Sequence, residues 1–258
     1  MGFWHNAHAL VTGAGSGIGA ATALALAQAG VRVSVAGRRM DRLAHTAARL
    51  GKRAGATVAM DVTDETAVAN GVARIEAEAG PIDILVNNAG KASSAPFERT
   101  DSEMWADMLA SNLSSVFFVT RAVLPGMARR GRGRVVNVAS SAGLTGYAYV
   151  SAYVAAKHGV VGLTRSLALE YARSGVTVNA VCPGYTDTPL VGEAAANIAA
   201  KTGRSEAEAR AMLAKVNPMQ RLVTPEEVAD TVLWLASAGA SAINGQSVAV
   251  AGGEVFTG

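Results

Sequence analysis

The chain has 258 residues, of which 50% are hydrophobic and 17% are charged, and its formal net charge is +3. A chain this long and apolar can bury a large core in one α/β domain, and its 28 glycines follow no collagen-like period. A net charge this small does not by itself indicate a nucleic-acid partner.

Short β-rich segments alternate with helical segments along the whole chain. We expect strands at 7–11, 31–36, 57–60, 82–86, 134–138, 176–181 and 247–250. We expect helices at 18–29, 41–50, 65–79, 101–129, 153–173 and 226–237, with a kink at Pro125. Because the strands are continuous apolar runs, they suit a parallel sheet covered on both faces. The sequence therefore predicts one α/β domain over residues 1–258, a doubly wound, Rossmann-like sheet of about seven parallel strands with helices on both faces.

The segment 185–221 breaks this regular alternation. It combines a turn, an Ala-rich helical piece and a charged piece. In an open parallel sheet, a segment inserted after the carboxyl end of a strand lies over the ligand crevice. We expect this segment to form a lid over the substrate.

Features of three kinds bear on the location of the protein. The N-terminal residues lack a cationic stretch followed by a long apolar one, so no signal peptide is expected, and Asn6 argues against N-myristoylation. No apolar run is expected to span a membrane. The one cysteine, Cys182, allows no intrachain disulfide and lies in an apolar run. It is expected to be a buried structural thiol, and its presence as a single cysteine fits a cytoplasmic location.

A glycine-rich turn, Thr12–Gly19, follows the first expected strand and opens the first expected helix. Gly13, Gly17 and Gly19 do not have the G-x-G-x-x-G spacing. Glycines here still permit a tight turn and close approach of a ligand to the backbone, and the following helix offers free N–H groups to a phosphate. The turn is either a phosphate site for a nucleotide cofactor or a purely structural turn.

The second expected strand ends in Ala36-Gly37-Arg38-Arg39. NAD-dependent enzymes usually carry an acid here for the ribose 2′-hydroxyl, whereas an arginine accommodates the 2′-phosphate of NADP. A guanidinium can bind that phosphate through two hydrogen bonds, so this segment favours NADP over NAD. The alternative is that one arginine caps a helix or faces water. After the third strand, Asp61 and Val62 could meet the adenine, or Asp61 could begin a helix.

Tyr153 and Lys157 stand four residues apart in an expected helix, which places a phenol and an ammonium group on one face. A free phenol has a pKa near ~10, and a neighbouring cation lowers it. Tyr153 is thus a candidate general acid and base. The alternative is that Tyr153 is a packing residue and Lys157 faces water. His158 points about 100° away around the helix and receives no catalytic role.

These motifs together resemble the short-chain dehydrogenase/reductase family over essentially the whole chain. Four signatures occur in order: the Thr12–Gly19 turn, Asn87-Asn88-Ala89-Gly90, Ser140 with Tyr153-x-x-x-Lys157, and Pro183-Gly184. Each signature alone is weak, but all four at these spacings are specific. One departure is Ala251, where the family often has an aspartate. We expect it to alter a local turn or a subunit contact.

The resemblance implies a role for each matching residue. Tyr153 would be the catalytic acid/base, and Lys157 would lower its pKa and bond the nicotinamide ribose. Ser140 would hold the substrate carbonyl oxygen, with Ser141 as its neighbouring alternative. Asn112 would position a proton-relay water, although it could also simply satisfy a helix. The implied cofactor contacts are Gly13, Ser16, Gly17, Ile18, Gly19, Arg38, Arg39, Asp61, Val62, Asn88, Ala89, Gly90, Tyr153, Lys157, Pro183, Gly184, Thr186 and Thr188.

The resemblance also implies an activity. The chain would be an NADP(H)-dependent oxidoreductase that interconverts a ketone or 3-oxoacyl thioester and a secondary alcohol by hydride transfer. An NAD-dependent 3-hydroxyacyl or alcohol dehydrogenase and a non-enzymatic NADP-binding regulatory protein remain alternatives. A small carbonyl or alcohol compound would be the substrate, and the family suggests a homotetramer. The expected substrate pocket is mostly apolar or small, lined by Ser93, Ser94, Leu144, Tyr147, Val150, Tyr185 and Leu190.

Neither a metal nor a nucleic acid is expected as a partner. The four histidines are scattered and no Cys/His ligand set is evident. The basic cluster Arg129–Arg134 lacks the interleaved aromatic residues that favour nucleic-acid binding. We expect it to be a helix end and an exposed turn before a buried strand.

Overall fold

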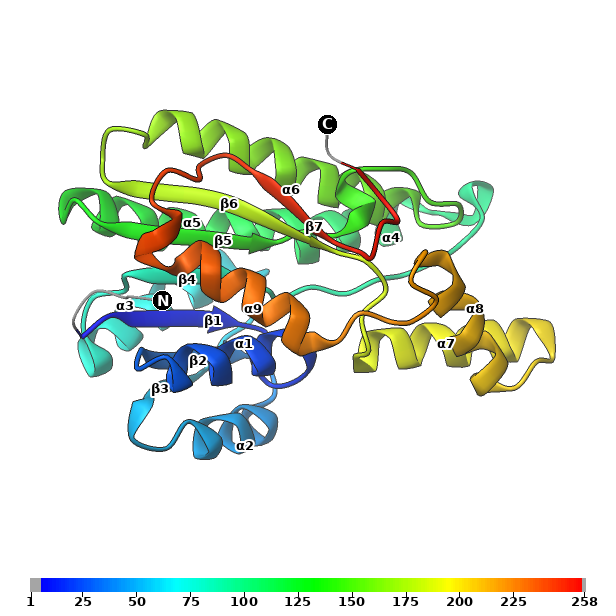
Figure 1. Cartoon of the computed structure of the whole chain (residues 1–258), viewed down its shortest axis with the longest axis horizontal. Helices are drawn as coiled ribbons and strands as arrows, with labels where there is room; N and C mark the ends of the chain where they lie inside the picture. Colours follow the sequence, from blue (N-terminus) through cyan, green and yellow to red (C-terminus); the bar gives the residue numbers. More distant parts are fainter. Residues whose placement is uncertain (1–5, 257–258) are drawn as a thin grey trace.

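The computed structural model describes residues 6–256 and contains one seven-stranded parallel sheet with helices on both faces (Figure 1). The strands are β1 (His8–Thr12), β2 (Arg32–Gly37), β3 (Ala54–Ala59), β4 (Ile84–Asn87), β5 (Gly133–Val138), β6 (Val176–Pro183) and β7 (Ser247–Val250). The expectations about a signal peptide and N-myristoylation rest mainly on residues 1–5, which lie outside the described residues.

The strand order is β3-β2-β1-β4-β5-β6-β7, and every neighbouring pair is parallel. The winding direction reverses between β1 and β4. In doubly wound sheets, ligands bind at the carboxyl ends of the strands beside this switch point. The predicted fold class is confirmed, and the topology also indicates where a ligand should bind.

Two hydrophobic cores cover the two faces of the sheet. Alternate residues of a strand point to opposite faces, so Val11 enters one core and Leu10 the other. On the first face lie α1 (Gly17–Gln28), α2 (Met40–Leu50) and α9 (Pro225–Ala236). On the second lie α3 (Glu65–Ala79), α5 (Ser115–Arg129) and α6 (Ser151–Glu170). Apolar strands buried on both sides are therefore the physical basis of the predicted parallel sheet.

The expected long helix at 101–129 is divided. It consists of α4 (Ser102–Leu109), a π-helical turn at Ala110–Ser114, and α5. The helix continues through Pro125 to Arg129, and the π-helical turn is a further irregularity that the sequence did not indicate. The kink at Pro125 stays a prediction. A π-turn inserts one extra residue into a helix and is frequent at functional sites. Asn112 lies inside it.

This helical run also bears on the membrane expectation. Ser102–Arg129 is long and apolar enough to cross a membrane by length and composition, with a mean hydropathy of 1.2. Polar and charged residues interrupt this segment, so it contains no long continuous apolar run. Half of the relevant window is buried inside the protein, and the core helix of a globular protein passes the same test.

The segment 185–221 folds mainly as two helices, α7 (Pro189–Thr202) and α8 (Glu206–Val216), which project from one end of the sheet (Figure 1). They pack on each other through a small apolar cluster that includes Val191, Ala195 and Leu213. An isolated bridge between Thr186 and Val223 joins the two ends of this helical pair. The pair is thus attached to the sheet through its ends and has its own small core.

Candidate active site

The candidate residues follow the carboxyl ends of six neighbouring strands. Gly13 follows β1, Arg38 follows β2, and Asp61 follows β3. Asn88 and Ser140 follow β4 and β5, and Gly184 follows β6. Because these strands are parallel and adjacent, their ends bring together residues that are far apart in the sequence.

The glycine-rich turn is held against the end of β4 by Asn88. The Asn88 side-chain amide donates to the carbonyl oxygens of Thr12 and Gly13 at 3.0 and 3.2 Å. Gly13 has a φ of 64°, and a Cβ added there would lie 2.8 Å from the Cα of Ala89. The turn therefore needs glycine at Gly13 for both conformation and close approach. Asn88 acts on the backbone of the turn, a contact that the sequence did not indicate.

The N-terminus of α1 presents donors to the same crevice. Ser16 is its N-cap residue, yet its side chain makes no capping hydrogen bond. Gly17 lies against Thr188, whose Cγ2 would be 3.0 Å from an added Cβ. Gly19 lies against Asn88 and Gly13, and Ile18 packs against the core. The free helix N–H groups and the Ser16 hydroxyl form the type of site that binds a phosphate.

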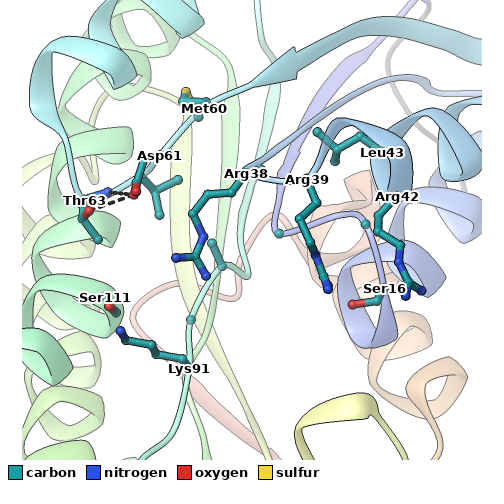
Figure 2. A pocket seen from close by; sticks show the side chains of 16 residues that line it. Ser16, Arg38, Arg39, Arg42, Leu43, Met60, Asp61, Thr63, Lys91 and Ser111 are labelled. Atoms are coloured by element: carbon teal, nitrogen blue, oxygen red, sulfur yellow. Dashed lines mark hydrogen bonds between the residues drawn. The ribbon is translucent and has the colours of Figure 1, made fainter.

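Beside this turn lies a cavity of about 190 Å³ (Figure 2). The guanidinium groups of Arg38, Arg39 and Arg42 extend along it, with Ser16 near Arg39 and Arg42. Predicted residues in its lining are Gly13, Ser16, Arg38, Arg39, Asp61, Val62, Ala89 and Gly90. The structure adds Gly15, Gly37, Arg42, Leu43, Met60, Thr63, Lys91 and Ser111.

Two of the three arginines, Arg38 and Arg39, are available for a ligand, whereas Arg42 lies 3.9 Å from the Asp41 carboxylate. Within the described residues, neither Arg38 nor Arg39 forms a salt bridge. Arg39 is the N-cap residue of α2, but its side chain makes no capping hydrogen bond. Arg42 lies in the first turn of α2, three residues after the N-cap residue Arg39, and all three arginines line the cavity. That spacing is the signal that could have identified Arg42 from the sequence.

Asp61 forms the opposite wall of the cavity. Its carboxylate accepts hydrogen bonds from the Thr63 backbone N–H at 2.9 Å and from the Thr63 hydroxyl at 2.8 Å. These bonds, and more weakly the charge of Arg38, lower the pKa of Asp61. The helix-capping acid is Asp64, which accepts from two N–H groups of α3. Asp61 therefore does not cap the helix and lines the cavity.

Ser140, Tyr153 and Lys157 lie together at the ends of β5 and α6. The Ser140 and Tyr153 side chains are hydrogen-bonded. Ser140 also accepts from the Ala142 N–H at 3.1 Å, so it begins a short helical turn as well. The Lys157 ammonium is buried, donates to the Val138 carbonyl at 3.0 Å, and lies 5.6 Å from the centroid of the Tyr153 ring.

Burial controls the titration of this cluster. Burial raises the pKa of Tyr153, and the hydrogen bond with Ser140 opposes that increase. Burial lowers the pKa of Lys157 to about 8. From the sequence we expect Lys157 to lower the pKa of Tyr153, whereas in this structure the pKa of Tyr153 is raised. Desolvation of the phenol outweighs other contributions, and the ammonium is directed to a backbone carbonyl.

Asn112 connects the π-helical turn to the cluster. Its Oδ1 accepts from the Lys91 N–H at 3.2 Å, and its Nδ2 donates to the Met108 carbonyl at 3.0 Å. A Cβ added at Gly90 would lie 2.7 Å from that Oδ1 and 3.9 Å from the Lys157 Nζ. The side chain thus holds the Gly90–Lys91 strand end beside Lys157. Gly90 also lines the cavity that contains the arginines, so Lys157 lies next to the lining of that cavity.

The segment after β6 closes the crevice from the other side. Pro183 ends the strand, and the Gly184 N–H donates to the Val250 carbonyl at 3.1 Å. The Thr186 hydroxyl donates to the Gly184 carbonyl at 2.9 Å, which turns the chain toward Thr188. Thr188 in turn packs on Gly17. The structure therefore brings Thr188 to the glycine-rich turn, whereas Thr186 is used in its own loop.

Three further sequence expectations can be compared with the structure. Cys182 is buried, and burial raises its pKa to about 11, as befits a structural thiol. His158 is exposed and contacts the Val154 carbonyl of its own helix. In the basic cluster, Arg130 and Arg132 form salt bridges with the buried Asp83. The cluster lies at a helix end and turn as expected, and Arg130 and Arg132 bind the protein itself.

Comparison with known proteins identifies the family. The sequence profile of short chain dehydrogenases matches residues 7–199. The chain belongs to the short-chain dehydrogenase family. A candidate ketoacyl reductase of Streptomyces coelicolor is 41% identical over 250 residues, 95% of each chain. A D-beta-hydroxybutyrate dehydrogenase of Rhizobium meliloti is 42% identical over 194 residues, 75% of each chain.

Solved structures agree with this family. A variant of actinorhodin polyketide ketoreductase with NADPH has 39% identity and a TM-score of 0.93, covering 98% of this chain and 99% of the other. Levodione reductase has 34% identity and a TM-score of 0.90, covering 96% and 97%. This short-chain dehydrogenase is therefore an oxidoreductase that acts on CH–OH or C=O groups with NAD(P).

Proposed function

We propose that the protein is an NADP(H)-dependent reductase of ketones or 3-oxoacyl thioesters in which Tyr153 is the acid/base. One observation carries the proposal: the hydrogen-bonded pair Ser140–Tyr153 has Lys157 beside it, and Lys157 lies next to Gly90, which lines the cavity that holds the three arginines. A similar solved structure is a polyketide ketoreductase with NADPH.

The residues of the crevice fit a nicotinamide dinucleotide phosphate. The N-terminus of α1 and the uncapped Ser16 hydroxyl would hold the pyrophosphate. Arg38 and Arg39, without salt bridges inside the described part of the chain, would hold the 2′-phosphate, with Asp61 and Val62 near the adenine. Gly90, Lys157, Gly184 and Thr188 would lie along the nicotinamide half. When bound, the cofactor supplies or accepts the hydride.

The side chains of the protein would move the proton. Ser140 would donate a hydrogen bond to the carbonyl oxygen of the substrate, and Tyr153 would donate its proton to that oxygen as negative charge develops on it. The raised pKa of Tyr153 keeps the phenol protonated at neutral pH, which suits the reductive direction. Lys157, with a pKa of about 8, would stabilise the phenolate that remains.

One further residue and one pair of helices would support this transfer. Asn112 holds Gly90 beside Lys157 and would help place a water that returns a proton to Tyr153. The helical pair α7–α8 would act as the lid, because Thr188 at its start already touches the glycine-rich turn. Closure of such a segment would exclude water from the reacting atoms.

The substrate class rests on the pocket and on the relatives. Tyr147 and Tyr185 stack edge to face with centroids 6.4 Å apart, Leu144 is partly buried, and Leu190 is 38% exposed. Relatives named for ketoacyl reduction and for hydroxybutyrate oxidation both act on a carbonyl or its alcohol. An NAD-dependent 3-hydroxyacyl or alcohol dehydrogenase is the second candidate on the latter ground. The intact set of Ser140, Tyr153 and Lys157 argues against a non-enzymatic regulatory protein.

We also propose a homotetramer and a cytoplasmic location. Exposed apolar side chains gather on the α4, α5 and α6 helices, among them Trp105, Phe117 and Leu169, the last 81% exposed. Burial of this area between subunits would be favourable. The single buried cysteine suits a reducing compartment.

The test of the proposed function is Tyr153→Phe. This change removes one hydroxyl and should lower kcat for ketone reduction by about 10²–10⁴-fold, the usual contribution of general acid catalysis. The Kd for NADPH should change by less than about threefold, since phenol removal spares the phosphate sites. Tyr171→Phe is the matched control, because this phenol lies at the far end of α6. Full activity in Tyr153→Phe would contradict the assigned role.

A further inference from the structure

The chain that follows β7 is folded so that Glu254 contacts Tyr147, one of the residues expected to line the substrate pocket, and lies beside Gly184. Gly252 and Gly253 both have positive φ, at 58° and 89°. A Cβ added at Gly252 would lie 2.0 Å from the Asn217 Oδ1, so the turn is fitted closely against the chain that follows α8. Glu254 itself lies against Gly184, because an added Cβ there would be 2.5 Å from Glu254 Oε2.

Glu254 is the end of a chain of hydrogen bonds. The Tyr147 hydroxyl is hydrogen-bonded to Glu254 Oε1, and it lies 2.9 Å from the Ser141 Oγ. A carboxylate can only accept, and a phenol has one proton to give. Tyr147 therefore donates to Glu254, and Ser141 must donate to Tyr147. With its proton used in this way, the Ser141 oxygen offers only lone pairs to any other group.

This series of hydrogen bonds ends next to Ser140, which would bind the substrate carbonyl in the proposed reaction. Ser141 follows Ser140 directly, and Tyr147 stacks on Tyr185, whose charge environment includes Glu254. Tyr185 also influences the pKa of Tyr153. The carboxylate is thus connected through Tyr147 to Ser141, the residue that follows Ser140, and it lies against Gly184.

One oxygen of the Glu254 carboxylate accepts no hydrogen bond from the described residues. Its Oε2 is buried and has no hydrogen-bond partner among residues 6–256. Burial raises its pKa, and the bond from Tyr147 opposes the increase. A buried acceptor without a donor is unfavourable unless a ligand or water supplies one.

We propose that Glu254 determines substrate specificity by orienting the hydroxyls of Tyr147 and Ser141, so that their oxygens are free to accept hydrogen bonds. The pocket would then prefer a neutral ketone that has a hydroxyl near the carbonyl. It would reject a ketone that has a carboxylate at that position. A substrate hydroxyl can donate to these oxygens, whereas a methoxy group cannot. A substrate carboxylate is repelled by the like charge of Glu254. This inference rests on the proposed carbonyl reductase activity.

The experiment uses the full-length enzyme with NADPH and three matched ketones. These are cyclohexanones that carry a hydroxyl, a methoxy group or a carboxylate at ring position 3 or 4. For the wild type we expect kcat/KM to be highest for the hydroxyl compound and lowest for the carboxylate. In Glu254→Gln the amide can donate to Tyr147 and reverse the chain, so the advantage of hydroxyl over methoxy should fall about tenfold, mainly through KM.

The carboxylate compound separates charge from hydrogen bonding. Its kcat/KM should rise at least about tenfold in Glu254→Gln but stay low in Glu254→Asp, which keeps the charge. Tyr147→Phe should lose the hydroxyl preference yet still reject the carboxylate, and it carries the test if Glu254→Gln does not fold. Glu170→Gln, an exposed change at the end of α6, should leave all three values unchanged.

The outcomes separate this inference from the proposed function. If the wild type reduces these ketones and Glu254→Gln keeps the wild-type order of preference, the role of Glu254 is wrong while the reductase activity stands. If the wild type reduces no ketone with either NADPH or NADH, the proposed function itself fails, and the specificity role fails with it.

Discussion

Replacement of Arg38 and Arg39 by alanine should change the cofactor preference from NADPH toward NADH. Both guanidiniums line the cavity, and in the described residues neither forms a salt bridge that its loss would disturb. Arg38 does help to lower the pKa of Asp61, so the Arg38→Ala variant leaves that carboxylate with slightly less positive surroundings. The two arginines would share one 2′-phosphate, which makes their effects non-additive.

The magnitude follows from the hydrogen bonds that are lost. A hydrogen bond to a charged group contributes about 1.5–3 kcal/mol, and each ~1.4 kcal/mol is a factor of ten in affinity. Each single variant should therefore weaken NADPH about 10–150-fold, and the double variant about 10²–10³-fold. NADH has no 2′-phosphate and should lose less than about fivefold, the scale of an exposed charge interaction.

The assay is the Kd of each reduced cofactor, followed by its nicotinamide fluorescence at fixed salt, together with kcat/KM for a ketone. Arg49→Ala is the matched control, because Arg49 lies in the last turn of α2 outside the cavity. It removes the same charge and should change neither Kd more than about twofold. Equal losses for NADPH and NADH in the double variant would refute the reasoning about the 2′-phosphate.

Two more changes probe the turn and the buried lysine. Gly19→Ala places a Cβ 2.4 Å from the Asn88 Nδ2 and 2.5 Å from the Gly13 carbonyl oxygen. It should therefore lower Tm by roughly 2–10 °C and weaken the binding of NADPH. Gly192→Ala is the control, because open space surrounds Gly192 and this change should not lower Tm. Calorimetry and cofactor titration measure both, and a Gly19→Ala protein as stable as the wild type would contradict the close packing. Lys157 has a folded pKa of about 8 and an unfolded one of 10.5, so between these values the unfolded state binds more protons and stability rises with pH. In cofactor-free protein, the stability of the wild type relative to Lys157→Met should therefore increase from pH 8 to 10.5, and a flat difference in unfolding free energy would count against the buried ammonium.

Much of the fold could be predicted because its determinants are local. The strands are continuous apolar runs, and turns such as Gly80-Pro81 mark their ends, so the α/β class and the parallel sheet follow. The π-helical turn around Asn112 was not predictable in this way, since no local signal distinguishes it from an α-helix with a proline further on. The division of 185–221 into two helices depends on Gly203 and on the capping box of Ser205 and Glu208, which an Ala-rich sequence obscures.

The candidate site likewise contains residues that the sequence could identify and residues that it could not. A sequence motif identifies Tyr153, Lys157 and Ser140, and the structure brings them together. Glu254 carries none, because its position depends on Gly252 fitting against Asn217 and on Tyr147 coming from another loop. The raised pKa of Tyr153 also escaped prediction, since spacing along a helix reports the nearby cation but not the depth of burial.

The two hydrogen bonds from the Asn88 side chain to the glycine-rich turn have a consequence for the order of folding. They join the backbone of Thr12 and Gly13 to a side chain 75 to 76 positions later, across the boundary between the two halves of the sheet. Contacts between distant parts of a chain form only after the loop between them has closed. We therefore expect the crevice to form late in folding, after both halves of the sheet have docked, and we expect a dinucleotide that binds it to stabilise only the completed fold.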